Sequence, residues 1–86
     1  MYYTYVLGSK LNKRLYTGYT NDLRKRFKEH NQKKSKYTKY RGPYELIYYE
    51  ACISLEDAKL REIYLKSGRG KAYLKGRLKR FLLRTR

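Results

Sequence analysis

The stretch from Tyr5 to His30 constrains the fold of this chain more than any other part of it. Two short runs rich in aromatic and β-branched residues, 2–7 and 15–20, flank a polar loop. This pattern predicts a β-hairpin. Helical spacing follows directly over residues 21–31, so the stretch predicts two paired strands joined at once to a helix. A slip of one residue would reverse every side chain, and the sequence leaves the register open.

The predicted helix over residues 21–31 starts at a capping residue, which we expect to be Thr20 or Asn21. Residues at i, i+4 and i+7 share one face of a helix, and here they are Leu23, Phe27 and His30. Arg26 borders the same face. The spacing therefore predicts that one arginine is held close to a strand pair that carries tyrosines.

The second half of the chain predicts one more strand and two more helices. Residues 44–51 are rich in tyrosine, leucine and isoleucine and read as a strand. A capping box at Ser54–Asp57 starts a helix over 54–66. Ser67–Gly70 should break it, because two glycines so close rarely lie inside one helix. A second helical pattern covers 71–83.

These elements predict an α+β fold in a single domain, 1–86. A small three-stranded antiparallel sheet, made of the hairpin and the third strand, should pack with helices at about 21–31, 54–66 and 71–83.

Charge narrows the range of partners. The chain carries 23 Lys and Arg against 7 Asp and Glu, a formal net charge of +16, which favours a polyanion. Nucleic acid is the first candidate, and a ribosome-associated or merely soluble basic surface is the alternative.

One cysteine and one histidine exclude the usual structural zinc site. No apolar run reaches membrane-spanning length and no signal peptide is evident, so we expect a cytoplasmic, nucleoid-associated protein without membrane contact.

A carboxylate occupies an unexpected position in the predicted helix over 54–66. The apolar stripe of that helix runs through Leu55, Ala58, Glu62 and Leu65. A carboxylate that faces the interior is costly unless it is paired or binds a metal. Glu62 therefore forms an ion pair with Arg26 or another cation, or it holds a divalent ion such as Mg²⁺.

Several of these residues together resemble a known signature. Tyr5, the run Tyr16-Thr17-Gly18, Arg26 and His30 are similar to the motifs of the GIY-YIG endonuclease superfamily. The first motif, at Tyr3-Thr4-Tyr5, lacks the family's glycine. The whole chain resembles small stand-alone bacterial members, of the URI type, that consist of little beyond the nuclease domain.

The resemblance implies a metal-dependent endonuclease that hydrolyses DNA phosphodiester bonds, as in DNA repair. The segment 58–62 is similar to the one whose glutamate binds the catalytic metal, so Glu62 would hold one Mg²⁺ or Mn²⁺. Arg26 would stabilise the phosphoryl charge, Tyr5 or Tyr16 would orient or deprotonate the water, and His30 would assist. Many members carry an asparagine about a dozen residues later, and residues 70–78 have none; Lys71 or Lys75 is the candidate for that space.

We expect basic residues outside the motif to bind the DNA backbone. The candidates are Arg24, Lys25, Lys36, Lys39, Arg41, Arg69, Lys71 and Lys75. Residues 33–41 interleave cations with tyrosines, which suits a flexible nucleic-acid strand or an ordinary solvated loop.

Two alternatives to the nuclease remain, a non-catalytic nucleic-acid-binding module and a structural protein of a ribonucleoprotein particle. We expect a monomer, with RNA a less favoured partner than DNA.

Overall fold

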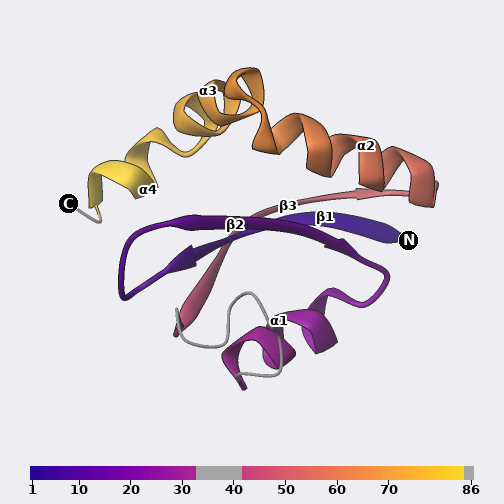
Figure 1. The fold of residues 1–86 in the computed structure, drawn as a ribbon, viewed down its shortest axis with the longest axis horizontal. Helices are drawn as coiled ribbons and strands as arrows, with labels where there is room; N and C mark the ends of the chain where they lie inside the picture. Colours follow the sequence, from indigo (N-terminus) through magenta and orange to yellow (C-terminus); the bar gives the residue numbers. More distant parts are fainter. Residues whose placement is uncertain (33–41, 85–86) are drawn as a thin grey trace.

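The fold is a twisted three-stranded sheet between one helix on one face and a chain of three helices on the other (Figure 1). It is described by a computed structural model that covers residues 1–32 and 42–84. The strands are β1 (Tyr2–Ser9), β2 (Leu15–Thr20) and β3 (Tyr44–Cys52), all antiparallel, in the order β2-β1-β3. The predicted α+β fold, with a hairpin and a third strand, is confirmed.

Helix α1 (Leu23–Asn31) covers one face of the sheet, and its start differs from the prediction. Neither Thr20 nor Asn21 is the cap. The cap is Asp22, whose Oδ1 accepts a hydrogen bond from the Lys25 backbone N at 3.1 Å. The Thr20 hydroxyl instead accepts from the Asp22 backbone N, which closes the turn between β2 and the helix.

Helix α2 (Leu55–Lys66) lies on the opposite face and begins at its predicted cap, Ser54. Helix α3 (Gly68–Arg77) follows after the single residue Ser67, and α4 (Lys79–Arg84) follows after Leu78. The pattern over 71–83 therefore forms two short helices instead of one.

The break at Ser67 is confirmed, but both nearby glycines lie in the first turn of α3. The Ser67 hydroxyl caps this turn by accepting from the Gly70 backbone N at 3.2 Å. A Cβ on Gly70 would lie 1.9 Å from the carbonyl oxygen of Tyr64. Gly70 is therefore needed because α3 packs directly against the last turn of α2.

Two small apolar layers cover the two faces of the sheet. On the α1 side, Tyr5, Leu7 and Tyr44 are buried, with Leu23 and Phe27 packed against them. On the other side the layer consists of Val6, Leu65 and Leu74, with Ile47, Tyr48 and Leu78 around them. A β-bulge lets the neighbours Ile47 and Tyr48 both face this second layer, because the register with β1 shifts between Val6 and Leu7.

Candidate active site

The register of the hairpin places the two motif tyrosines on one face of the sheet. Tyr5 lies opposite Gly18 and Leu7 lies opposite Tyr16, and directly opposed residues point to the same face. A Cβ on Gly18 would lie 2.5 Å from the Tyr5 hydroxyl oxygen. The ring of Tyr5 therefore lies directly over Gly18, and this contact explains why the motif carries glycine at this position.

Tyr5 joins β1 to α1 through its hydroxyl. That group lies 3.0 Å from His30 Nε2, and it also forms a hydrogen bond with Arg26. A guanidinium donates and never accepts, so the Tyr5 oxygen accepts from Arg26. In the contact between Tyr5 and His30, the imidazole tautomer determines which of the two groups donates.

The protonation states in this cluster follow from burial and from the arginine. Burial raises the pKa of Tyr5 to about 12, with the charges of Tyr16 and Glu62 adding to the rise and Arg26 opposing it. Burial, together with the charge of Arg26, lowers the pKa of His30 to about 4. Burial alone would lower the pKa of Arg26, but hydrogen bonds to Tyr5 and Glu29 outweigh it and raise the pKa. At neutral pH both ring groups are therefore uncharged beside a charged guanidinium.

Tyr16 is the more accessible of the two tyrosines. Its ring packs edge-on against His30, with 4.9 Å between the ring centroids. Tyr16 is half-buried, whereas the exposed fraction of Tyr5 is 1%. Tyr16 also lines an open groove of about 610 Å³ at the edge of β2. The other residues lining this groove are Asn12, Arg14, Leu15, Tyr44, Glu62 and Lys66.

Glu62 enters this groove from α2. Its side chain is 19% exposed, and its carboxylate lies 3.5 Å from the Lys66 ammonium one turn further along. Arg26 pairs with Glu29 of its own helix at 3.3 Å. Glu62 therefore forms the ion pair expected from the sequence, and its partner is Lys66. The carboxylate also lies within electrostatic reach of Tyr5, because its charge contributes to the raised pKa of that phenol.

The surroundings of Glu62 fit a hard divalent cation that retains water and phosphate ligands. Among residues 1–32 and 42–84, no group of three or more His, Cys, Asp and Glu side chains is arranged to hold a metal. Mg²⁺ usually takes one or two carboxylates and completes its shell with waters and substrate phosphates. A single accessible carboxylate beside a groove is sufficient for that mode of binding.

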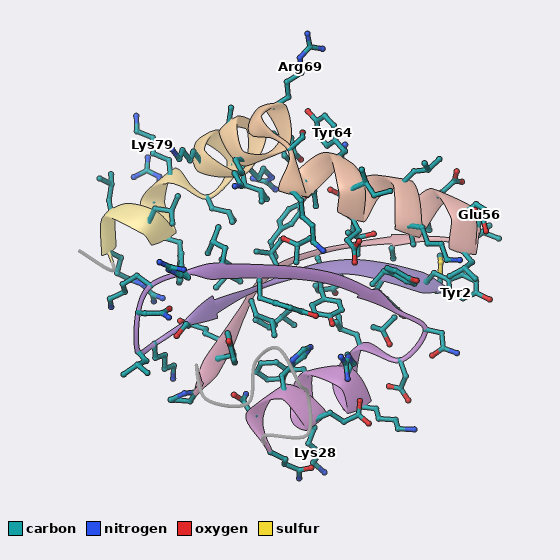
Figure 2. The ribbon with its side chains drawn as sticks, in the orientation of Figure 1. Tyr2, Lys28, Glu56, Tyr64, Arg69 and Lys79 are labelled. Carbon is teal, nitrogen blue, oxygen red and sulfur yellow. The ribbon has the colours of Figure 1, made fainter. Side chains whose placement is uncertain are left out.

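The predicted nucleic-acid-binding residues fall into three groups. Lys71 and Lys75 line a second groove with Arg14, Tyr16 and Lys66, so they adjoin the site. Arg24 and Lys25 line a groove on the outer side of α1, and Arg69 extends away from the sheet at the start of α3 (Figure 2). Lys36, Lys39 and Arg41 lie outside the described residues.

Two basic residues beside the site were missed from the sequence. Arg14 lines both grooves from a position two residues before Tyr16, and Lys66 lies four residues after Glu62. The i to i+4 spacing of Glu62 and Lys66 was a usable signal, because such positions are neighbours on a helix surface. Lys71 and Lys75, suggested for the space of the missing asparagine, do line the groove next to Tyr16.

Comparison with known proteins identifies the family of this chain. The model of the GIY-YIG catalytic domain matches residues 1–80. The chain therefore belongs to the GIY-YIG family, whose domains are nucleases that act on DNA.

Its relatives are UPF0213 proteins. One from Clostridium perfringens (strain 13 / Type A) is 46% identical over 67 residues, 77% of this chain and 71% of that protein. One from Streptococcus pyogenes serotype M3 is 51% identical over 65 residues, 74% and 70% of the two chains. The solution NMR structure of a UPF0213 protein from Bacillus halodurans is similar, with a TM-score of 0.54 and 40% identity. That match covers 88% of this chain and 84% of the other.

No helix in the described part of the chain is long and apolar enough to cross a membrane.

Proposed function

We propose that this protein is an endonuclease that hydrolyses phosphodiester bonds of DNA with the help of one divalent ion, Mg²⁺ or Mn²⁺. One observation carries the proposal. Tyr16 and Glu62 line one groove whose rim carries Arg14 and Lys66, and the ring of Tyr16 packs on His30, which belongs to the buried cluster with Tyr5 and Arg26. Phosphodiester hydrolysis needs an activated water, stabilisation of phosphoryl charge and help for the leaving oxygen, and this set of groups can supply all three.

Tyr16 is the tyrosine we assign to the attacking water. It lines the groove, whereas the Tyr5 hydroxyl is enclosed between Arg26 and His30. With a pKa of about 12, Tyr5 keeps its proton at neutral pH and is a poor general base. Tyr5 instead positions Arg26. Tyr16 would orient the water and accept its proton in a field of nearby cations.

Arg26 is the group we assign to the phosphoryl charge. Its guanidinium matches the geometry of phosphate oxygens, and hydrogen bonds to Tyr5 and Glu29 hold it in place before substrate arrives. Such fixed donors stabilise charge that develops in the transition state. His30 is 1% exposed and contacts Tyr5, so we assign it a positioning role rather than contact with the phosphate.

Glu62 would hold the divalent ion, which when bound supplies Lewis-acid stabilisation of the phosphate or leaving oxygen. Lys66 neutralises this carboxylate in the free protein. Lys71 and Lys75 would contact the DNA backbone beside the scissile phosphate. The cellular setting that we propose is DNA repair at the nucleoid in the cytoplasm, with the protein acting as a monomer.

The test is incubation with end-labelled single-stranded, duplex and branched DNA, with Mg²⁺, with Mn²⁺ and with EDTA. We expect metal-dependent nicking that Glu62→Gln abolishes while DNA binding persists. Glu56→Gln is the matched control, since Glu56 lies on the same helix, pairs with Lys59 and has an exposed side chain. A folded protein that cleaves none of these substrates with either ion contradicts the proposal. An unchanged rate in Glu62→Gln removes the metal role.

The second candidate function is a non-catalytic nucleic-acid-binding module. The net charge of +16 and the cations around both grooves favour it. Salt-dependent binding without cleavage of DNA or RNA would identify it.

A further inference from the structure

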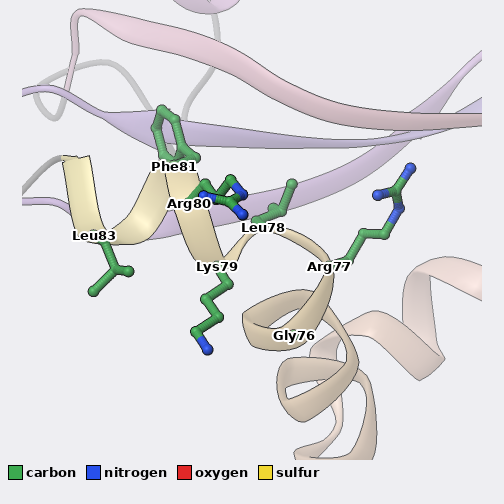
Figure 3. A pocket seen from close by; sticks show the side chains of 7 residues that line it. All are labelled: Gly76, Arg77, Leu78, Lys79, Arg80, Phe81 and Leu83. Atoms are coloured by element: carbon green, nitrogen blue, oxygen red, sulfur yellow. The ribbon is translucent and has the colours of Figure 1, made fainter.

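A second set of cations gathers where the β1–β2 loop meets α4, outside the groove that holds Glu62. Lys10 and Lys13 line a pocket with Phe81 and Leu82. The corner between α3 and α4 forms an adjoining groove (Figure 3). We call the following cations the basic end: Lys10, Lys13, Arg77, Lys79 and Arg80.

The basic end carries uncompensated charge. Among the described residues, none of its five side chains forms an ion pair with a carboxylate. Glu45, which lines the pocket with Lys10 and Lys13, already pairs with Arg84 at 3.3 Å. In Figure 3 the Lys79 side chain extends away from the sheet, whereas Phe81 points toward the strands. Phe81 is half-buried, whereas all five residues of the basic end are exposed.

Lys13 adopts a backbone conformation that a lysine seldom adopts. Its φ is 65°, in the left-handed region that glycine and asparagine tolerate better. The loop imposes this conformation: the Ser9 hydroxyl accepts from the backbone N of Leu11 and of Asn12, and Asn12 Oδ1 accepts from Arg14 N. The chain therefore holds a cation at the loop tip at a conformational cost that glycine would avoid.

The loop connects the basic end to the candidate active site. Asn12 and Arg14 line the groove of Glu62 and Tyr16, and Lys10 and Lys13 line the pocket under α4. Leu15 lines both. A strand whose scissile phosphate lies beside Tyr16 can therefore continue over the loop onto the basic end.

We propose that the basic end binds the phosphate backbone of the nucleic-acid substrate beyond the scissile position; the identity of the partner rests on the proposed function. Regularly spaced phosphates suit several separate, unpaired cations, since each contact releases a condensed counterion. The net charge of the chain, +16, favours the same class of ligand. The basic end would thus supply affinity without base specificity, because phosphate contacts position a protein on DNA and carry no sequence information.

The decisive variant is Lys13→Gly, which removes the charge and relieves the strained backbone together. Its affinity for labelled DNA is measured without metal over a series of salt concentrations. We expect a dissociation constant raised about fivefold at 0.15 M salt and a slope of log K against log salt smaller by about 0.7–0.9. Its midpoint of thermal unfolding should equal or exceed that of the wild type, so weaker binding cannot be attributed to misfolding. The double variant Lys79→Gln/Arg80→Gln should reduce the slope by about twice as much.

Lys59→Gln is the matched control, since Lys59 pairs with Glu56 on α2 and lies outside both grooves and the basic end. Unchanged affinity and slope in both basic-end variants would overturn the inference. Weaker binding of polyglutamate with unchanged DNA binding would also overturn it, in favour of an acidic protein partner. A wild type that binds DNA but never cleaves it refutes the endonuclease and leaves this surface standing. A wild type that cleaves, with both basic-end variants binding DNA normally, refutes the surface alone.

Discussion

The hydroxyl of Tyr5 lies 3.0 Å from Nε2 of His30, and this contact connects the central strand of the sheet to α1. Both side chains are almost fully buried. The pKa of His30 is lowered to about 4 and that of Tyr5 is raised to about 12, so at neutral pH the imidazole is neutral and the phenol keeps its proton. The pair therefore makes the stability of the fold depend on pH at both ends of the scale.

Stability should fall with acid over the window set by His30. In the unfolded chain the imidazole binds a proton as pH falls below its ordinary pKa of 6.5. In the folded chain it binds a proton only when pH approaches 4. Because the unfolded state holds more protons between these values, the free energy of unfolding decreases by at most about 1.4 kcal/mol per pH unit as pH falls. Urea unfolding from pH 7 to pH 4 measures the slope. His30→Gln should lower stability at pH 7 and reduce the slope, and an undiminished slope would locate the titration elsewhere.

Stability should also fall with alkali over the window set by Tyr5. Between pH 10 and about 12 the phenol ionises in the unfolded chain while the folded chain keeps its proton. The free energy of unfolding should therefore decrease as pH rises through this range. Tyr5→Phe lacks the titrating group, so its stability curve above pH 10 should be flatter than that of the wild type. Equal slopes would contradict the assignment to Tyr5.

The two motif tyrosines should respond differently when each loses its hydroxyl. Tyr16→Phe removes the group assigned to the water, so we expect single-turnover cleavage slower by about 10²–10⁴ with DNA binding unchanged. Tyr5→Phe removes the hydroxyl that accepts from Arg26 and hydrogen-bonds with His30, so it should lower both stability and cleavage. Quench-flow cleavage and thermal unfolding of both variants separate the roles. If Tyr5→Phe cleaves more slowly at unchanged stability while Tyr16→Phe stays fully active, then Tyr5, and not Tyr16, acts on the water.

Gly18→Ala should displace the ring of Tyr5. The new methyl group would lie 2.5 Å from the hydroxyl oxygen and 2.7 Å from the ring carbon that bears it. Overpacking of this kind costs about 1–3 kcal/mol, and it would move Tyr5 away from Arg26 and His30. Urea unfolding gives the loss of stability. Gly8→Ala is a fitting control in the same hairpin, because its nearest contact would be an ordinary 3.5 Å to Ile47. Equal effects at the two positions would show that the ring does not determine the cost.

Two of the three glycines of α3, Gly70 and Gly76, should respond to alanine with opposite signs. At Gly70 the methyl group would lie 1.9 Å from the Tyr64 carbonyl oxygen and 2.4 Å from the Leu65 Cα, so α3 must separate from α2. At Gly76 nothing lies within 4 Å, and alanine should stabilise the helix by about 0.5–1 kcal/mol. Thermal unfolding of the pair tests this. A neutral Gly70→Ala would contradict the close approach of the two helices.

Lys66 should compete with a divalent ion for Glu62. Its ammonium lies 3.5 Å from the carboxylate and must release it before an ion binds there. We expect Lys66→Gln to bind Mn²⁺ more tightly, by a few-fold, as measured by electron paramagnetic resonance without DNA. Lys59→Gln, which alters the similar pair with Glu56, should leave Mn²⁺ binding unchanged. Weaker or unchanged binding in Lys66→Gln would refute the competition.

Local signals in the sequence were sufficient for the three strands, α1 and α2, and for Tyr16 and Glu62 in the groove, but not for Arg14 and Lys66. Glu62 stood out because it interrupts an apolar stripe, and its side chain does lie at the edge of the core. The strand and helix periodicities placed every element of the sheet and located the end of α2. The cap of α1 was placed one or two residues early because Thr20, Asn21 and Asp22 are all competent caps. The corner at Leu78 was missed because an unbroken apolar spacing predicts a continuous helix.

What the sequence determined by itself was the set of chemical groups and the local structures that carry them, since periodicity, capping and charge act over a few residues. The tertiary structure decided which groups meet. The hairpin register put Tyr5 and Tyr16 on one face, the packing of α1 gave Tyr5 its partners, and α2 brought Glu62 and Lys66 to the same groove. Pairing and burial between distant segments set those relations, and a pKa of about 4 for His30 exists only once they are in place.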